Sequence, residues 1–241
     1  MGGLYLRNLT LIDITLAFFI TLVVFLCLHM AKRMNGVTKT EWIPRKLVHI
    51  TISSTIAFSL PFFNSLSGPI YTILLIGVGF LTLIACGNNL QEFLQIGTRK
   101  GEHLIDTFLA SSLSIVSFGI VYLSFNSEPF VYISAILFTS WGDGAGEIFG
   151  RTIGKHKINK FYIHKTLEGT LGVFTLSLFA IFISCILFWD ISKLLTLQRF
   201  PIVISISIVV SIIEFLSAKW VDNLTIPIIG ALLLHILYTM V

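Results

Sequence analysis

Residues 130–150 read FVYISAILFTSWGDGAGEIFG, and in this stretch an apolar run passes directly into glycine-rich sequence. The apolar run extends only from Phe130 to Trp141. A helix that crosses the roughly 30 Å of membrane hydrocarbon needs about 20 apolar residues. This run therefore reaches full length only by continuing into the glycines, and we expect that end of the helix to face protein or water instead of lipid.

Seven further apolar runs surround this stretch, each near the length of a membrane-spanning helix. They are Ile14–Ala31, Leu47–Phe63, Leu66–Cys86, Leu104–Leu123, Leu171–Trp189, Phe200–Ala218 and Leu224–Val241. The chain of 241 residues is 55% hydrophobic and 12% charged, with a mean hydropathy of +0.92. This composition excludes a soluble globular enzyme, a disordered chain and a disulfide scaffold. We predict an all-α polytopic membrane protein of about eight transmembrane helices, with residues 1–241 forming a single integral membrane domain.

The distribution of lysine and arginine gives an independent check on the number of spans, because cytoplasmic loops carry an excess of these residues. With eight spans, three of the 16 basic residues fall on one side, namely Arg7, Lys193 and Arg199. The other thirteen fall on the opposite side: Lys32, Arg33, Lys39, Arg45, Lys46, Arg99, Lys100, Arg151, Lys155, Lys157, Lys160, Lys165 and Lys219. We therefore expect both termini on the non-cytoplasmic side. The net charge of +4 is explained by these loops, and no nucleic-acid partner is predicted.

The longest predicted cytoplasmic loop, residues 143–169, reads DGAGEIFGRTIGKHKINKFYIHKTLEG. Its glycines allow backbone amides to approach an anion closely, and its basic side chains can neutralise phosphate charges. The residues concerned are Gly144, Gly146, Gly150, Gly154, Arg151, Lys155, Lys157 and Lys165. Asp143 and Glu147 are four residues apart, so a helical turn would place both carboxylates on one face, where they suit Mg2+. We predict a nucleotide-binding loop.

A simpler interpretation of the loop is that its basic residues only fix the topology and contact lipid headgroups. Topology alone requires neither the acids nor the glycines. No GxxxxGK[ST] sequence occurs, so a P-loop is not available.

Other polar residues gather on the same predicted side of the membrane. Arg45 and His49 lie four residues apart at the start of the second helix, beside Lys46. Interfacial snorkelling would equally explain the two basic residues. Glu214 lies inside an apolar run, where a carboxylate costs roughly 2.5–3.5 kcal/mol, so we expect it to have a partner or a function. Asp222 and Asn223 follow in a short turn, where either residue also suits a helix N-cap.

Taken in order, these motifs resemble the membrane-embedded CTP-dependent lipid-alcohol kinases, which include dolichol kinase, phytol and farnesol kinases and a CTP-using diacylglycerol kinase. The resemblance covers most of the chain. It rests on Arg45-Lys46-x-x-His49, Gly142-Asp143-Gly144-Ala145-Gly146, Gly150-Arg151, Gly154-Lys155-His156-Lys157, Lys165-Thr166-Leu167-Glu168-Gly169, Glu214 and Asp222-Asn223-Leu224-Thr225-Ile226-Pro227. The central loop alone is also similar to phosphatidate cytidylyltransferases. Their C-terminal signature, His-Gly-Gly followed by Asp-Arg-x-Asp, is missing here, which favours the kinases.

The resemblance implies transfer of the γ-phosphate of CTP to the hydroxyl of a membrane isoprenoid alcohol, with Mg2+ as cofactor. It makes Asp143 and Glu147 the metal ligands. The expected nucleotide-binding residues are Arg45, Lys46, Gly150, Arg151, Lys155, Lys157, Lys165, Glu168 and Asn223. The catalytic residues would be Asp143 and a general base chosen among His49, Glu214 and Asp222, between which the sequence does not decide.

Several alternatives stay open. A diacylglycerol kinase and a phosphatidate cytidylyltransferase are the nearest, and the small size of the chain favours dolichol, another polyprenol or a shorter prenyl alcohol over diacylglycerol as the substrate. One alternative from another class is an ion-coupled transporter, which would show inverted repeats and polar residues near the middle of the membrane. Another is a lipid-binding scaffold, which would not need both Asp143 and Glu147. The expected partners are the lipid alcohol, CTP and membrane lipids, and self-association is left open. We expect the endoplasmic reticulum in a eukaryote or the plasma membrane in a prokaryote, with a cytoplasmic active site.

Overall fold

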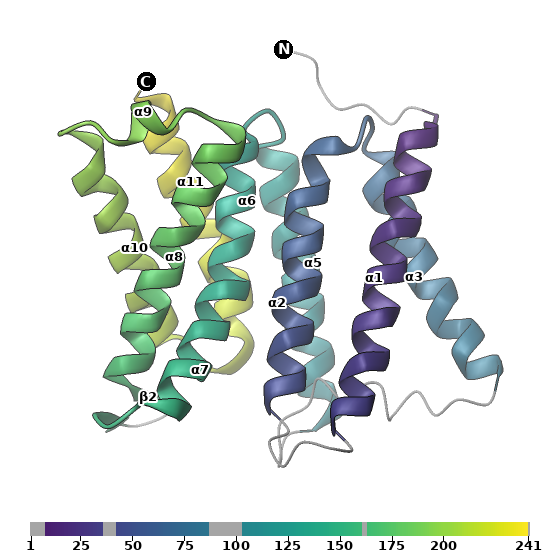
Figure 1. The fold of residues 1–241 in the computed structure, drawn as a ribbon, viewed down its shortest axis with the longest axis horizontal. Helices are drawn as coiled ribbons and strands as arrows, with labels where there is room; N and C mark the ends of the chain where they lie inside the picture. The colour runs from purple at the N-terminus through teal and green to yellow at the C-terminus, as the bar shows by residue number, and fades with distance from the viewer. Residues whose placement is uncertain (1–7, 36–41, 87–102, 161–162, 241) are drawn as a thin grey trace. The chain divides into compact units, whose positions relative to one another are not determined.

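The computed structural model describes residues 8–35, 42–86, 103–160 and 163–240, and most of them are helical. Contacts along the chain group the residues into two compact units, Met1–Phe108 and Leu109–Val241. The sequence shows no linker and predicts a single domain, whereas the contacts divide the chain into these two units. Within the described residues each unit is built from helices that lie side by side, as the ribbon in Figure 1 shows.

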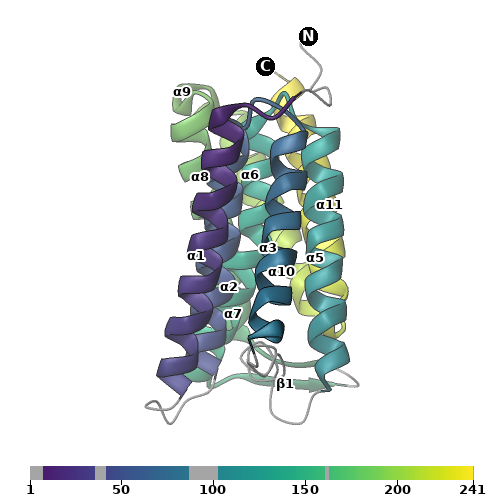
Figure 2. The same cartoon turned by 90° about the vertical axis from the view of Figure 1, so that its right-hand side faces the viewer.

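The first unit is a group of helices in which α1 contacts both α2 and α3 (Figure 2). Its elements are α1 (Leu11–Asn35), α2 (Trp42–Ser59), the short η1 (Leu60–Phe62) and α3 (Ser67–Ala85). Asp13 in the first turn of α1 is fully buried. Its carboxylate accepts hydrogen bonds from the Asn64 main-chain N–H at 2.8 Å and the Ser65 hydroxyl at 3.0 Å. This buried acid ties the start of α1 to the turn before α3.

The second unit contains most of the polar residues that the sequence marks as functional. Its elements are α5 (Leu104–Ser124), α6 (Pro129–Leu137), η2 (Phe138–Gly142), α7 (Asp143–Thr152), β1 (Lys157–Lys160), β2 (Ile163–Thr166), α8 (Leu167–Phe188), α9 (Ile191–Leu194), α10 (Arg199–Leu216), η3 (Lys219–Val221) and α11 (Asp222–Thr239). The first residues of α5 precede the boundary of the unit at Leu109.

The short apolar run from Phe130 to Trp141 includes α6, which is buried within the second unit. All residues from Phe130 to Leu137 are buried, and α6 packs against α8 and α11. The chain continues through η2, a π-helical segment, into α7 without leaving the helical conformation. The prediction that this run extends into the glycines and ends against protein is confirmed. Because protein rather than lipid surrounds α6, it does not need the length of a membrane span.

Six of the described helices are long and apolar enough to cross a membrane: α1, α3, α5, α8, α10 and α11. The predicted class, an all-α polytopic membrane protein, agrees with this. The two remaining predicted spans coincide with α2 and α6. The total of eight spans and the sides on which the termini lie stay predictions.

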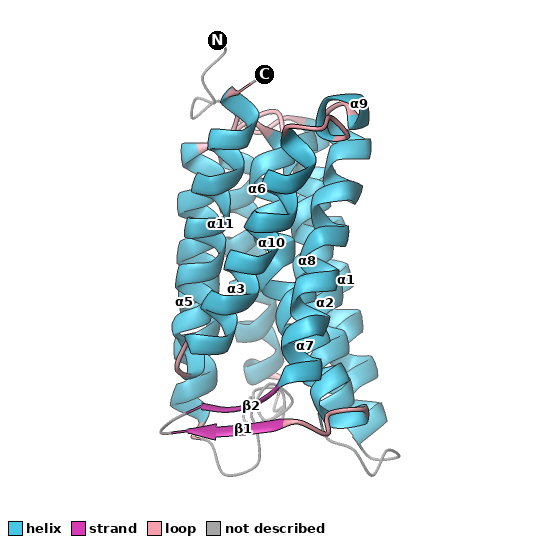
Figure 3. Cartoon of the chain, turned by 90° about the vertical axis from the view of Figure 1, so that its left-hand side faces the viewer, coloured by secondary structure: helices cyan, strands magenta, loops and turns pink. Residues whose placement is uncertain are grey.

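Residues 143–169, predicted as a cytoplasmic nucleotide-binding loop, have regular secondary structure over most of their described part, and their nucleotide binding stays a prediction. This segment forms α7, an antiparallel hairpin of β1 and β2, and the start of α8. In the hairpin Lys157 is paired with Thr166, and Lys160 with Ile163. Figure 3 shows the hairpin in magenta at one end of the second unit. Gly146, Gly150 and Gly169 lie where α7 packs closely against α8.

Candidate functional site

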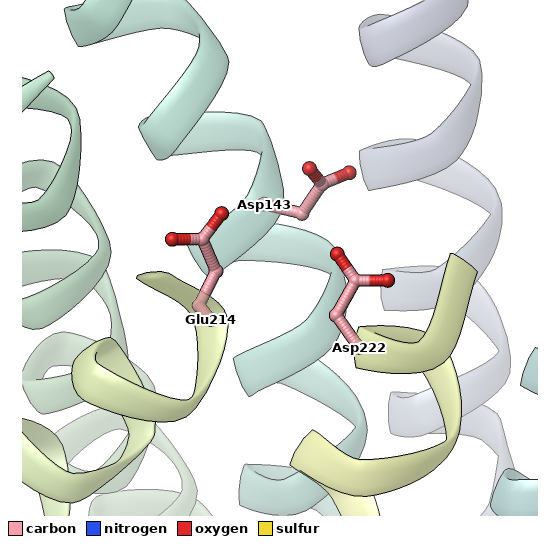
Figure 4. A group of neighbouring side chains, drawn as sticks. All are labelled: Asp143, Glu214 and Asp222. Carbon is pink, nitrogen blue, oxygen red and sulfur yellow. The ribbon is translucent and has the colours of Figure 1, made fainter. Parts of the chain in front are cut away.

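Three acidic side chains from distant parts of the sequence meet in the second unit. Asp143 is the first residue of α7, Glu214 lies near the end of α10, and Asp222 is the first residue of α11. One carboxylate oxygen from each lies within 4.8 Å of the others. Figure 4 shows the three carboxylates converging from these helices. We call Asp143, Glu214 and Asp222 the carboxylate cluster.

Packing around α8 brings the cluster together. α8 contacts both α7 and α10, and α10 contacts α11. Glu214 is 7% exposed, whereas Asp143 and Asp222 are half-buried. Three like charges at this separation repel one another, and burial strengthens that repulsion, so the cluster requires cations close by.

The donor set of the cluster fits a hard divalent cation. Carboxylate oxygens are the ligands that Mg2+ and Ca2+ prefer. Two oxygens on opposite sides of an ion are about 4 Å apart for Mg2+ and about 5 Å apart for Ca2+. The separations within the cluster, up to 4.8 Å, lie in this range. One ion could therefore bind all three residues with small side-chain movements.

Lys165 on strand β2 supplies a positive charge to the cluster. Its Nζ lies 2.8 Å from Glu214 Oε1, and it also donates a hydrogen bond to the main-chain oxygen of Glu214. That oxygen belongs to the last turn of α10, where carbonyl groups lack helical partners. Lys165 therefore both neutralises an acid of the cluster and caps the end of α10.

Glycines allow α7 to lie directly on α8 beside the cluster. A Cβ atom at Gly169 would be 2.8 Å from the main-chain oxygen of Gly146, and one at Gly150 would be 3.0 Å from Thr166 Oγ1. A Cβ at Gly146 would be 3.0 Å from Val173 and 3.8 Å from Glu214 Oε1. These positions have no space for a larger side chain. The structure thus gives Gly150 a packing role, and its predicted contact with nucleotide stays a prediction.

Glu147, predicted as a metal ligand, is not a member of the carboxylate cluster. Its Oε1 accepts hydrogen bonds from Nε and Nη2 of Arg151, both at 2.9 Å. The spacing of four residues that predicted a pair with Asp143 places Glu147 equally well beside Arg151, one turn further along α7. The structure brings Asp143 together with Glu214 and Asp222, which sequence reasoning named only as candidate bases.

Glu168 binds a basic partner at the base of the hairpin. Its Oε1 is 2.7 Å from Nδ1 of His156, and both carboxylate oxygens accept the main-chain N–H of His156 at 3.3 Å. Thr166 caps α8 by accepting the N–H of Gly169 at 3.1 Å. These bonds fix the strand that carries Lys165. The role of His156 was not predicted, although the residue lies within a quoted motif.

The two basic residues before and within β1, Lys155 and Lys157, are exposed at the same end of the second unit. Together with Arg151, half-exposed on α7, they place three positive charges near the hairpin. Their predicted contact with phosphate groups stays a prediction.

Asn223 helps to hold Asp222 in place. Its main-chain N–H donates to Asp222 Oδ1 at 2.9 Å, and its carbonyl accepts the hydroxyl of Ser117 on α5 at 2.7 Å. The N-cap of α11 is Val221, so neither Asp222 nor Asn223 is the capping residue. Asn223 therefore helps to fix the position of the Asp222 carboxylate. Its predicted contact with nucleotide stays a prediction.

Three predicted site residues, Arg45, Lys46 and His49, lie on α2 in the first unit. Lys46 is 3% exposed, and Arg45 and His49 are half-buried. The cluster and Lys165 belong to the second unit. Nucleotide binding by Arg45 and Lys46 and base catalysis by His49 stay predictions.

Comparison with known proteins identifies a similar lipid-modifying enzyme. The chain is 28% identical over 134 residues to a phytol kinase from Synechocystis sp. strain PCC 6803. The match covers 55% of this chain and 54% of that kinase, so it spans about half the length of the curated relative. No family model matches the chain, and no solved structure matches it. The similarity supports a relationship to lipid-alcohol kinases.

Proposed function

We propose that this protein is a CTP-dependent kinase that transfers the γ-phosphate of CTP to the hydroxyl of a membrane isoprenoid alcohol. The acceptor is dolichol, another polyprenol or a shorter prenyl alcohol. The observation that carries the proposal is the carboxylate cluster with Lys165, placed at one end of a unit built from membrane-type helices. The similarity to a phytol kinase supports a prenyl alcohol as the acceptor, since phytol is itself one.

The chemistry of phosphoryl transfer suits this arrangement of charges. Such transfer needs positioning and charge neutralisation more than covalent participation of the protein. Asp143, Glu214 and Asp222 would hold Mg2+, which when bound neutralises charge on the phosphate oxygens. Lys165 and the basic residues near the hairpin, Arg151, Lys155 and Lys157, would bind the triphosphate.

In the proposed reaction the alcohol oxygen attacks the γ-phosphorus, and the bond from that phosphorus to the bridging oxygen breaks. CDP leaves, and the lipid becomes a monophosphate. The proton of the alcohol passes to a base. Glu214 or Asp222 could take the proton only through a carboxylate oxygen that the ion does not occupy, and His49 stays the third candidate.

Product analysis with purified full-length protein tests the proposal. CTP labelled in the γ or the α phosphate is supplied with phytol, geranylgeraniol, dolichol, diacylglycerol or phosphatidate, and the lipids are separated by thin-layer chromatography. We expect label from the γ position only, and on the prenyl alcohols. The Asp143→Asn protein serves as the background control.

Any other result would change the proposed acceptor, the proposed donor or the proposed reaction. Transfer to diacylglycerol alone would make the protein a diacylglycerol kinase, and transfer of α label to phosphatidate would make it a cytidylyltransferase. Equal activity with ATP would remove the claim for CTP. Absence of transfer to every alcohol by the folded protein would overturn the kinase proposal.

A further inference from the structure

Lys165 and a divalent cation would use the same carboxylate, that of Glu214. The Nζ of Lys165 is 2.8 Å from Oε1 of Glu214, and Glu214 is one of the three acids that could hold the ion. A cation bound to a carboxylate oxygen lies about 2 Å from it. Two positive charges at the same carboxylate repel each other strongly in a partly buried site.

We propose that Lys165 competes with the divalent cation for Glu214, so that binding of the cation releases the Lys165 side chain toward the phosphates of the nucleotide. The inference deepens the proposed function and rests on it. Lys165 then acts as a positioning residue whose location depends on the metal. Cation and nucleotide would bind in a coupled way, because the first frees a ligand for the second.

The hairpin makes a side-chain movement possible without a change in the backbone. The base of the hairpin is fixed by the Glu168–His156 pair and by the hydrogen bond from Leu167 N–H to the carbonyl of His156 at 3.1 Å. Lys165 precedes the N-cap of α8 by one residue. Its flexible side chain is 26% exposed, so its ammonium group can turn to solvent or to a phosphate by rotation alone.

A purely structural role makes a different prediction. The second bond of Lys165, to the main-chain oxygen of Glu214, caps α10 and does not depend on the metal. If capping were the whole function, Lys165 would stay in place when the ion binds. A measurement of whether the Lys165 side chain moves when the ion binds therefore distinguishes the two roles.

Amine footprinting of the full-length protein in detergent follows Lys165 directly. The protein is acylated briefly with a lysine-selective reagent, with or without saturating Mg2+, and the labelling of Lys165 is measured by mass spectrometry. Lys193, at the opposite end of the second unit, is the internal control. We expect Mg2+ alone to raise labelling of Lys165 several-fold and a non-hydrolysable CTP analogue to lower it again, while Lys193 stays constant.

Matched variants give an independent measurement of the competition. Mn2+ binding without nucleotide should tighten about tenfold in Lys165→Met if Lys165 occupies Glu214 in about nine molecules of ten. Arg151→Gln removes the same charge from the same end of the unit but leaves Glu214 untouched, and should change Mn2+ binding by less than about twofold. In Glu214→Gln, labelling of Lys165 should no longer respond to Mg2+.

The outcomes separate this inference from the proposed function. Unchanged or reduced labelling of Lys165 at Mg2+ concentrations that demonstrably bind would overturn the competition and leave the kinase proposal standing. Equal Mn2+ affinities for Lys165→Met and the wild type would also overturn it. Failure of the wild-type protein to bind either ion would overturn both the inference and the metal role in the proposed function.

Discussion

The two ends of the second unit both carry charged residues, but they arrange them differently. At the end opposite the hairpin, Glu128 pairs with His235 at 2.7 Å, and Arg199 donates to the main-chain oxygens of Lys193 and Met240 (Figure 1). These charged groups are satisfied by local partners. At the hairpin end, three acids converge, and Lys165 contacts one of them, Glu214.

This difference supports our proposal that the hairpin end carries the functional site. Pairing one charge with one partner stabilises helix ends at little cost. Convergence of three carboxylates opposes folding through repulsion, and such an arrangement is typical of sites that bind a cation or perform chemistry. The predictions below test this contrast, beginning with the largest effect.

The largest expected effect is the loss of activity in Asp143→Asn. Removing one ligand of the cation should lower turnover at least about 100-fold, because electrostatic stabilisation supplies most of the catalysis in phosphoryl transfer. The melting temperature should be unchanged or slightly raised, since the variant removes a repelling charge. Phosphate transfer at saturating Mg2+ and CTP, together with thermal unfolding in detergent, measures both.

Glu128→Gln is the matched control at the opposite end. It removes the charge of one partly exposed ion pair, so its turnover should stay within about twofold and its free energy of unfolding should fall by less than about 1 kcal/mol. Equal losses of activity in the two variants would remove the functional distinction between the ends.

The close contact between α7 and α8 predicts the next largest effect. Gly169→Ala should lower the free energy of unfolding by about 1–3 kcal/mol, because the new methyl group has no space beside Gly146. Gly119→Ala on α5 is the control, as its Cβ would meet nothing within 4 Å. In that helix alanine should stabilise by up to about 1 kcal/mol. If thermal unfolding ranked the two variants in the reverse order, glycine packing would not explain how the site is assembled.

The smallest expected effect concerns Asp190, which caps the short helix α9. Hydrogen bonds from the hydroxyl and N–H of Ser192 hold the pKa of Asp190 below its usual value of 3.8. Because the pKa is lowered in the folded state, the stabilisation is present above the unfolded pKa and is lost as the pH falls through the folded pKa. The difference in melting temperature between wild type and Asp190→Asn should therefore be constant near neutral pH and disappear in acid. A difference that grew on acidification would contradict this account.

Much of the helical framework was predictable because membrane helices leave long apolar runs in the sequence. Leu104–Leu123 and Phe200–Ala218 agree with α5 and α10 within two residues. The hairpin was not predicted, since the polar sequence of Lys157–Thr166 shows no alternating apolar pattern.

The candidate site was predictable in its members but not in its arrangement. Asp143, Glu214 and Asp222 stand out as polar residues beside apolar runs, yet only the packing of α7 and α10 against α8, and of α11 against α10, brings them together. The pairing of Glu147 with Arg151 followed the same spacing rule that suggested a pair with Asp143. The spacing of Gly146 and Gly150 is also a visible signal of close helix contact, which the structure shows at both positions.

The most direct test of the central claim is a switch of metal preference at the carboxylate cluster. Replacing the Asp143 carboxylate by a thiolate in Asp143→Cys should abolish phosphate transfer with Mg2+ and restore part of it with the softer cations Mn2+ or Cd2+, because sulfur ligands favour softer ions. The wild-type protein should prefer Mg2+ and stop when all divalent cations are chelated. Wild-type transfer that continued under chelation, or an Asp143→Cys protein as active with Mg2+ as the wild type, would contradict the assignment of the cluster as the metal site.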